Sequence, residues 1–137
     1  NYSYGGLRIM DNTMALLLSD TYKQCHDRMY PKGLTKLVSY WVPRKSMLEN
    51  QNEMVFFGLQ AFIKEYLMGY FQKNFFDLSE DEMLTLYTDS MDVQIGRGNY
   101  DLDKIVELHK LGYLPLEIRA LPEGTLVPMG IPCIKYR

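Results

Sequence analysis

The stretch LPLEIRALPEGTLVPMGIPCIKY, residues 114–136, decides the fold class of this chain. Apolar and polar side chains alternate over residues 114–121, which is the period of a β-strand with one buried face. The turn-forming triplet PEG follows at residues 122–124, and short strands are predicted over residues 125–127 and 131–136. Because helical patterns precede these strands, the sequence predicts an α+β fold with helices packed on a small, mainly antiparallel sheet.

Four helices are predicted upstream of these strands, over residues 20–29, 54–68, 80–87 and 102–111. One unbroken helix over residues 13–29 is the alternative to the first of them. Gly58 lies inside the second helix and suggests that another element packs closely against it. Ser79 and Glu82 have the spacing of a capping box at the start of the third helix, and Gly112 is placed to end the fourth.

A strand is predicted over residues 34–42, which are rich in β-branched and aromatic side chains. Pro43 is expected to end this strand, so that Arg44 follows directly after it. A guanidinium in that place can bind a phosphate group through two parallel hydrogen bonds. The alternative for Arg44 is a lone, solvated surface arginine.

The composition is that of a globular protein, with 47% hydrophobic and 23% charged residues among 137. This length fits one domain and is too short for a (β/α)8 barrel, which needs about 250 residues. The net charge is −2 and no basic stripe or long apolar run is present, so neither nucleic acid nor a membrane is an expected partner. We expect residues 1–12 to be an N-terminal extension or residues added for expression, and residues 13–137 to be a partial α+β domain.

Cys25 and Cys133 are the two cysteines, too few for a disulfide-stabilised secreted domain. They are expected to be free thiols in a reducing, cytoplasmic compartment. The chain also has 11 Tyr and 9 Met. This excess fits either core packing or a protein interface, where both residue types are enriched.

Polar side chains gather on the first predicted helix, where Asp20, Tyr22, Lys23 and His26 lie within seven residues. Asp20 and Tyr22 together can orient a substrate, and the alternative is a polar helix start exposed to water. Cys25 precedes His26, but a zinc site needs a second pair of ligands with suitable spacing. No metal site is therefore predicted here.

Two other features are interpreted as structural. The triplet GRG at residues 96–98 lacks the spacing of a phosphate-binding loop, so a plain turn is favoured over an anion-binding nest. His109 lies in the apolar stripe of its helix and is expected to pack there or face solvent, and not to bind a ligand.

Four motifs, in this order, resemble nicotinamide phosphoribosyltransferases. They are SDTYK at 19–23 with His26 after it, SY at 39–40 with Arg44 after it, VFFGLQ at 55–60, and LPLEIRA at 114–120 with PEG after it. The resemblance covers residues 16–70 and 113–131 well and residues 71–112 weakly. One departure is the triplet WVP at 41–43, which replaces a more polar approach to the arginine.

The resemblance implies the N-terminal part of an enzyme of NAD biosynthesis. Such glycosyltransferases join nicotinamide to phosphoribosyl pyrophosphate, giving nicotinamide mononucleotide and pyrophosphate, with magnesium and with assistance from ATP hydrolysis. They are homodimers whose two active sites lie at the subunit interface. Most catalytic groups belong to a later barrel-like domain, so we expect this chain to hold no catalytic residue, to bind no cofactor alone and to be inactive alone.

Three substrate-binding residues follow from the resemblance by position. Tyr22 matches a tyrosine that reaches into the partner's site and stacks on the nicotinamide ring. Asp20 matches an acid that lines the same pocket, and Arg44 matches an arginine that contacts phosphate across the interface. Lys23 and His26 match as well and are given supporting roles.

Two other functions stay open for the sequence. One is a non-catalytic module, either a split subunit or a dimerisation domain, which the Tyr and Met content permits. The other is a nicotinate phosphoribosyltransferase, which shares the fold and the chemistry.

Overall fold

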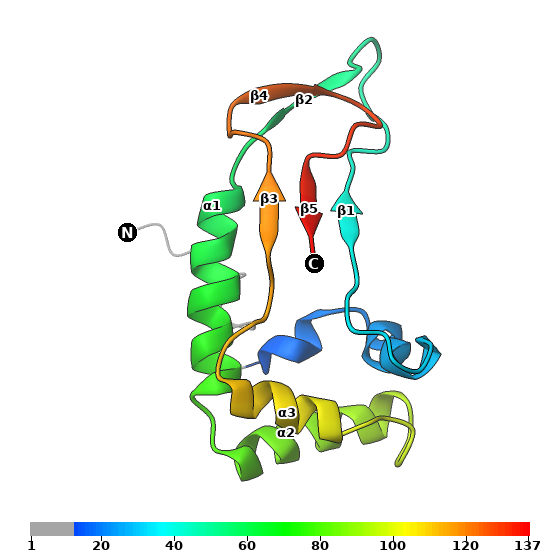
Figure 1. Ribbon diagram of the computed structural model, residues 1–137, viewed down its shortest axis with the longest axis vertical. Helices are drawn as coiled ribbons and strands as arrows, with labels where there is room; N and C mark the ends of the chain where they lie inside the picture. The colour runs from blue at the N-terminus through cyan, green and yellow to red at the C-terminus, as the bar shows by residue number, and fades with distance from the viewer. Residues whose placement is uncertain (1–12) are drawn as a thin grey trace. The chain divides into compact units, whose positions relative to one another are not determined.

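The computed structural model describes residues 13–137 and divides them into two compact units (Figure 1). Residues 13–30 and 64–114 form a helical unit, and residues 31–63 and 115–137 form a unit that holds the strands. Helices and short antiparallel strands confirm the predicted α+β class. The extension predicted for residues 1–12 lies outside the described part. Within that part, no helix has the length and apolar character needed to cross a membrane.

The helical unit begins with two 3-10 helices, η1 (Ala15–Leu18) and η2 (Thr21–Met29). Ser19 separates them with an extended backbone, φ −90° and ψ 163°. The prediction of a separate helix ending at Met29 is therefore confirmed, and the alternative of one unbroken helix over 13–29 is wrong. The nine residues of η2 are long for a 3-10 helix, since runs beyond three or four residues are uncommon.

The helix predicted over residues 54–68 is wrong at its beginning. Residues Glu53–Phe56 form the strand β2, and the helix begins only at α1 (Leu59–Phe62). Gly58 lies between them with φ +94°, a left-handed backbone that glycine adopts readily. A Cβ atom at Gly58 would meet no atom within 4 Å, so this glycine serves the strand-to-helix turn and not a close neighbour.

After α1 the helix continues with wider turns in the π conformation. Its two π-helical segments are η3 (Ile63–Tyr70) and η4 (Gln72–Phe76). Asn74 departs from helical geometry, with φ −108° and ψ 16°. Its side-chain amide donates to the Tyr70 carbonyl oxygen at 3.2 Å, which satisfies a buried polar group beside the irregular turn.

Two α-helices complete the helical unit, α2 (Glu80–Gln94) and α3 (Asp103–Leu111). The Ser79 hydroxyl accepts from the backbone N–H of Glu82 at 3.2 Å, so the predicted cap is confirmed at the start of α2. The helix runs further than the predicted end at Tyr87. Gly112 ends α3 with φ +75°, as predicted.

The core of this unit is built on one face of α2, where Met83, Tyr87 and Met91 recur every fourth residue and are fully buried. Phe75 joins them and contacts the ring of His109 edge to face, at 5.4 Å between ring centroids. The His109 Nε2 atom lies 2.9 Å from the Leu78 carbonyl oxygen. The histidine is thus a packed, hydrogen-bonded residue, as the sequence indicated.

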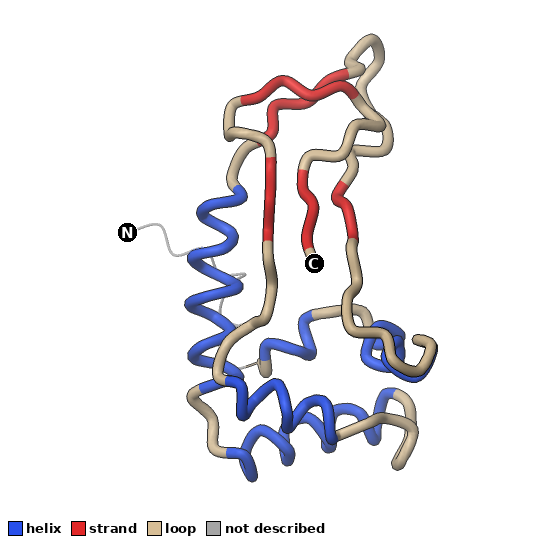
Figure 2. Tube along the Cα trace, in the orientation of Figure 1, coloured by secondary structure: helices blue, strands red, loops and turns tan. Residues whose placement is uncertain are grey.

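The second unit contains two small antiparallel sheets. Three strands pair in the order β1-β5-β3, and two others pair as β2-β4. Besides β2, the strands are β1 (Ser39–Trp41), β3 (Ile118–Ala120), β4 (Thr125–Pro128) and β5 (Ile134–Tyr136). Except for β4, these strands are shorter than the predicted segments, and the rest of each segment is loop (Figure 2).

A small core of Phe56, Val127 and Cys133 holds this unit together. The β2-β4 pair is tied to the turn before β4, because the Gly124 N–H donates to the Phe56 carbonyl oxygen at 2.8 Å. The Glu123 carboxylate accepts from the backbone N–H of Gln60 at 2.8 Å, in the first turn of α1. A negative group is favourable at this end of a helix.

Candidate functional site

Tyr22 presents its ring on the surface of η2, with a relative exposure of 62%. The ring of His26 lies beside it, with centroids 5.3 Å apart and planes tilted by 57°. The Lys23 Nζ atom is 5.9 Å from the centroid of the Tyr22 ring. The structure therefore brings these three predicted side chains together around one exposed aromatic face.

Asp20 directly precedes η2 and pairs with Lys23, with its Oδ2 atom 3.3 Å from Nζ. Both side chains are at least half exposed, so this ion pair adds little stability. The backbone N–H of Lys23 donates to the Asp20 carbonyl oxygen at 2.9 Å and forms the first turn of η2. Among residues 13–137 the carboxylate makes no helix-capping hydrogen bond, so it stays accessible beside Tyr22.

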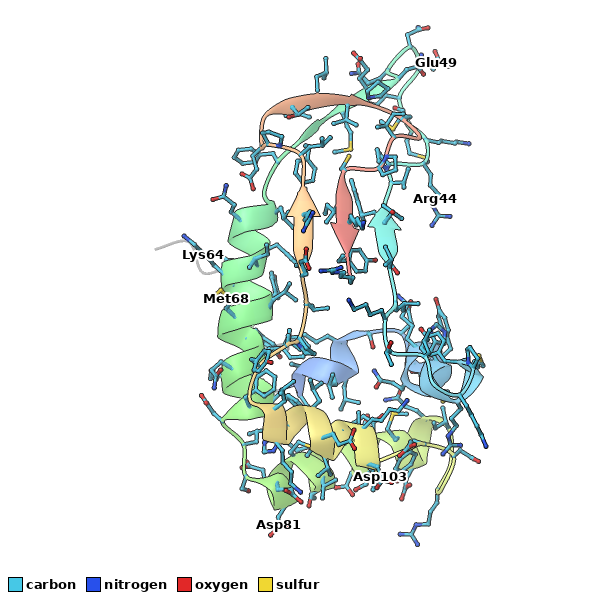
Figure 3. The ribbon with its side chains drawn as sticks, viewed as in Figure 1. Arg44, Glu49, Lys64, Met68, Asp81 and Asp103 are labelled. Carbon is cyan, nitrogen blue, oxygen red and sulfur yellow. The ribbon has the colours of Figure 1, made fainter. Side chains whose placement is uncertain are left out.

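Arg44 belongs to the second unit and is exposed in the loop after β1. Figure 3 shows its side chain projecting from this loop and away from the strands. The carbonyl oxygen of buried Pro43 accepts from the Gly130 N–H at 2.7 Å, which fixes the backbone just before the arginine. No described residue forms a hydrogen bond or ion pair with the guanidinium, which leaves its donors open to solvent.

The two cysteines are free thiols, as predicted. The Cys25 Sγ atom lies 3.9 Å from the Asn99 carbonyl oxygen, at the limit of a weak hydrogen bond. Cys133 is buried, and this burial raises the pKa of its thiol. In the described part of the chain, no three His, Cys, Asp or Glu side chains gather as metal ligands. The described residues therefore do not fit a magnesium site.

The GRG triplet at residues 96–98 forms a turn, as favoured by its spacing. Gly96 and Gly98 both have positive φ, and Arg97 Nε lies 3.4 Å from Asp92 Oδ2. The Tyr100 hydroxyl donates to the other oxygen of Asp92 at 2.5 Å, and this hydrogen bond raises the pKa of Tyr100. The Asp92 carboxylate of α2 therefore contacts both Arg97 in the turn and Tyr100 after it.

A charged hollow of about 60 Å³ was missed by sequence reasoning; Glu117, Arg119, Lys135 and Arg137 line it. Arg119 and Arg137 both bond the Glu117 carboxylate, through Nε atoms at 2.7 and 2.6 Å. The hydrogen bond from Arg137, and then that from Arg119, hold the pKa of Glu117 below its usual value. A sequence signal for this hollow exists: charged residues alternate with apolar ones along β3 and β5, so that Arg119 and its cross-strand partner Lys135 lie on one face of the sheet.

Sequence reasoning also missed Gln24, whose side chain makes three hydrogen bonds beside Tyr22. Nothing in its local pattern singles it out, since its partners are an earlier carbonyl group, a serine and a distant tyrosine. Only the packing of η2 within the helical unit brings them together.

Comparison with known proteins shows the family of the chain. Residues 14–118 match the family model described as "Nicotinamide phosphoribosyltransferase, N-terminal domain". The chain is 39% identical over 120 residues to the nicotinamide phosphoribosyltransferase of Acinetobacter baylyi, a match that covers 84% of this chain and 24% of that relative. These matches show that the chain is a domain of the phosphoribosyltransferase class. It belongs to the nicotinamide phosphoribosyltransferase family and carries that family's N-terminal domain.

Proposed function

We propose that this chain is the N-terminal part of an enzyme that makes nicotinamide mononucleotide and pyrophosphate from nicotinamide and phosphoribosyl pyrophosphate, in NAD biosynthesis. The observation that carries the proposal is the family match over residues 14–118, with its tyrosine motif exposed at Tyr22. The chain spans about a quarter of the length of the curated relative that it matches. In this proposal the glycosyl transfer itself depends on parts of the enzyme beyond these residues.

Tyr22 is proposed to stack on the nicotinamide ring. The neighbouring Lys23 and His26 leave more than half of the Tyr22 side chain accessible, which supports this role. Offset stacking between aromatic rings contributes about 0.5–1.5 kcal/mol beyond the burial of area. That amount changes the affinity for a small planar substrate by about 2- to 10-fold.

Asp20 and Arg44 are each proposed as a polar substrate-binding residue. The exposed Asp20 carboxylate accepts hydrogen bonds and suits the amide group of nicotinamide. The unpaired Arg44 guanidinium suits a phosphate group, which it can bind through two parallel bonds. Both side chains keep free bonding capacity on the surface, which a substrate would use.

The proposed enzyme is a cytoplasmic homodimer that uses magnesium and ATP. Some of the methionines support a subunit interface. Met83 and Met91 are buried in the core, whereas Met29, Met47 and Met68 are exposed and available for contact. Exposed methionines support contact with further protein, because methionine is enriched at protein interfaces relative to the rest of the surface. Tyr22 and Arg44 would then complete the site of the partner subunit.

Steady-state kinetics of the whole enzyme test this function. Tyr22→Ala is expected to raise the KM for nicotinamide, whereas Tyr22→Phe keeps the ring and retains most of the affinity. Tyr113→Ala removes another exposed tyrosine of the helical unit and serves as the matched control. Unchanged KM and kcat in Tyr22→Ala would contradict the stacking role of Tyr22. Faster use of nicotinate than of nicotinamide would show that nicotinate is the substrate.

A further inference from the structure

The helix η2 forms side-chain hydrogen bonds to other elements of the helical unit. It is a nine-residue 3-10 helix, and 3-10 hydrogen bonds have poorer geometry than those of an α-helix. Thr21 and Gln24 lie one turn apart on it, and both bond to α2: the Thr21 hydroxyl donates to Gln94 Oε1, and Gln24 bonds to Tyr87. These polar contacts therefore determine where the residues of η2 lie.

Gln24 makes the largest number of these contacts. Its Nε2 atom donates to the Leu16 carbonyl oxygen at 2.6 Å and to the Ser19 hydroxyl at 2.7 Å. Its Oε1 atom accepts from the Tyr87 hydroxyl at 3.2 Å. Both amide hydrogens and one side of the carbonyl oxygen are thus used. One side chain joins η1, the extended corner at Ser19 and α2 to the helix η2.

Tyr87, the partner of Gln24 on α2, lies in a rigid part of the helical unit. Tyr87 is fully buried in the core of the helical unit and contacts the ring of Tyr100 edge to face, at 5.8 Å between centroids. Close-packed interiors transmit a displacement instead of absorbing it. Tyr22 lies two residues before Gln24, and its ring contacts within residues 13–137 are with His26 and Lys23 of the same helix.

We propose that Gln24 is a positioning residue, which fixes the Tyr22 ring for substrate binding by tying η2 to the buried hydroxyl of Tyr87. This role rests on the proposed function, because it assumes that Tyr22 contacts nicotinamide. Gln24 itself touches no substrate in this scheme. Its loss is expected to let η2 shift or fray while the helical core stays folded.

A probe on Tyr22 tests the positioning without any activity measurement. 3-Fluorotyrosine is placed at Tyr22 in the whole enzyme, and its ¹⁹F resonance is compared among variants. Gln24→Met keeps the length of the side chain but removes its polar atoms, and Tyr87→Phe removes the hydroxyl that donates the third hydrogen bond to Gln24. Both are expected to shift or broaden the resonance. Gln72→Met, which removes a Gln72–Asp77 hydrogen bond elsewhere in the same unit, is expected to leave it unchanged.

Kinetics then test the consequence for binding. Loss of one hydrogen bond changes an equilibrium by about 2- to 10-fold, so Tyr87→Phe is expected to raise the KM for nicotinamide within that range. Gln24→Met loses three hydrogen bonds and is expected to raise this KM at least as much. The KM for phosphoribosyl pyrophosphate and kcat are expected to stay near their original values. The double variant Gln24→Met/Tyr87→Phe is expected to be no worse than Gln24→Met, because both changes break the same link.

The outcomes separate the two proposals. An unchanged ¹⁹F resonance in Gln24→Met and Tyr87→Phe overturns the positioning role. So does a fall in kcat and melting temperature with an unchanged KM for nicotinamide, which is the result of a merely structural residue. If the resonance shifts but Tyr22→Ala has normal kinetics, the proposed function of Tyr22 fails while the link from Gln24 to η2 stands. Should Gln24→Met not fold, Tyr87→Phe carries the same comparison alone.

Discussion

Glu117 and Arg137 face each other across two antiparallel strand segments and bond twice through the backbone. The Glu117 N–H donates to the Arg137 carbonyl oxygen at 2.8 Å, and the Arg137 N–H donates back at 3.1 Å. Their side chains also form an ion pair, which Arg119 joins from the same strand as Glu117. A charged cross-strand pair of this kind stabilises the register of a sheet.

This ion pair is expected to make stability depend on pH. Because Arg137 and Arg119 hold the pKa of Glu117 below its ordinary value of 4.5, the pair stabilises the fold above that pH and is lost as pH falls through the lowered pKa. Melting temperatures between pH 7 and pH 3 should show Glu117→Gln below the parent protein at neutral pH, with the gap closing in acid. Glu49→Gln, at an exposed loop position, is the control. A gap that persists unchanged at pH 3 contradicts this account.

The carboxylate of Glu123 is expected to stabilise the first turn of α1. It accepts from the Gln60 N–H at 2.8 Å, so Glu123→Ala leaves that donor without its partner and is expected to lower the free energy of unfolding by about 1 kcal/mol. Glu123→Gln keeps an acceptor oxygen and should lose less. Urea unfolding of the three proteins gives the comparison. Equal stability of Glu123→Ala and the parent would show that water replaces the contact at no cost.

Substitutions of Gly58 are expected to lower the stability of the fold because of its backbone conformation. Its φ of +94° is strained for L-residues, although space is open around it, so Gly58→Ala is expected to cost about 1 kcal/mol through conformation alone. Asparagine tolerates left-handed backbone better, and Gly58→Asn should therefore be the milder change. Thermal unfolding distinguishes them. If alanine is tolerated as well as asparagine, the strand-to-helix turn must have relaxed to a different geometry.

The two thiols are expected to react at different rates. Cys133 is buried and its pKa is raised by that burial, so little thiolate forms near pH 8, whereas Cys25 is partly exposed. Iodoacetamide should therefore alkylate Cys25 first, by more than about tenfold in rate. Peptide mapping by mass spectrometry after timed quenching measures both sites in one sample. Faster alkylation of Cys133 would mean that its small core opens readily.

The sequence predicted the fold class and the boundaries that depend on neighbouring residues. The Ser79 cap and the Gly112 stop involve groups within a few residues of each other, so a local pattern determines them. The sequence-based prediction was wrong at β2, where an apolar run was interpreted as the start of a helix over 54–68. The strand forms because Met54 and Phe56 pair with residues about 70 positions later, in β4. No local period reveals such a partner.

The candidate site likewise has features that follow from local sequence and features that depend on packing. The sequence by itself determined the motif that marks the family, with Asp20, Tyr22 and Arg44, and the helical turn that carries Tyr22, because these follow from residue identity and short spacing. Only the tertiary structure decided that η2 is a 3-10 helix and that Gln24 ties it to buried Tyr87. A side-chain hydrogen bond needs two groups within about 3 Å, and between residues 63 positions apart packing alone provides that proximity.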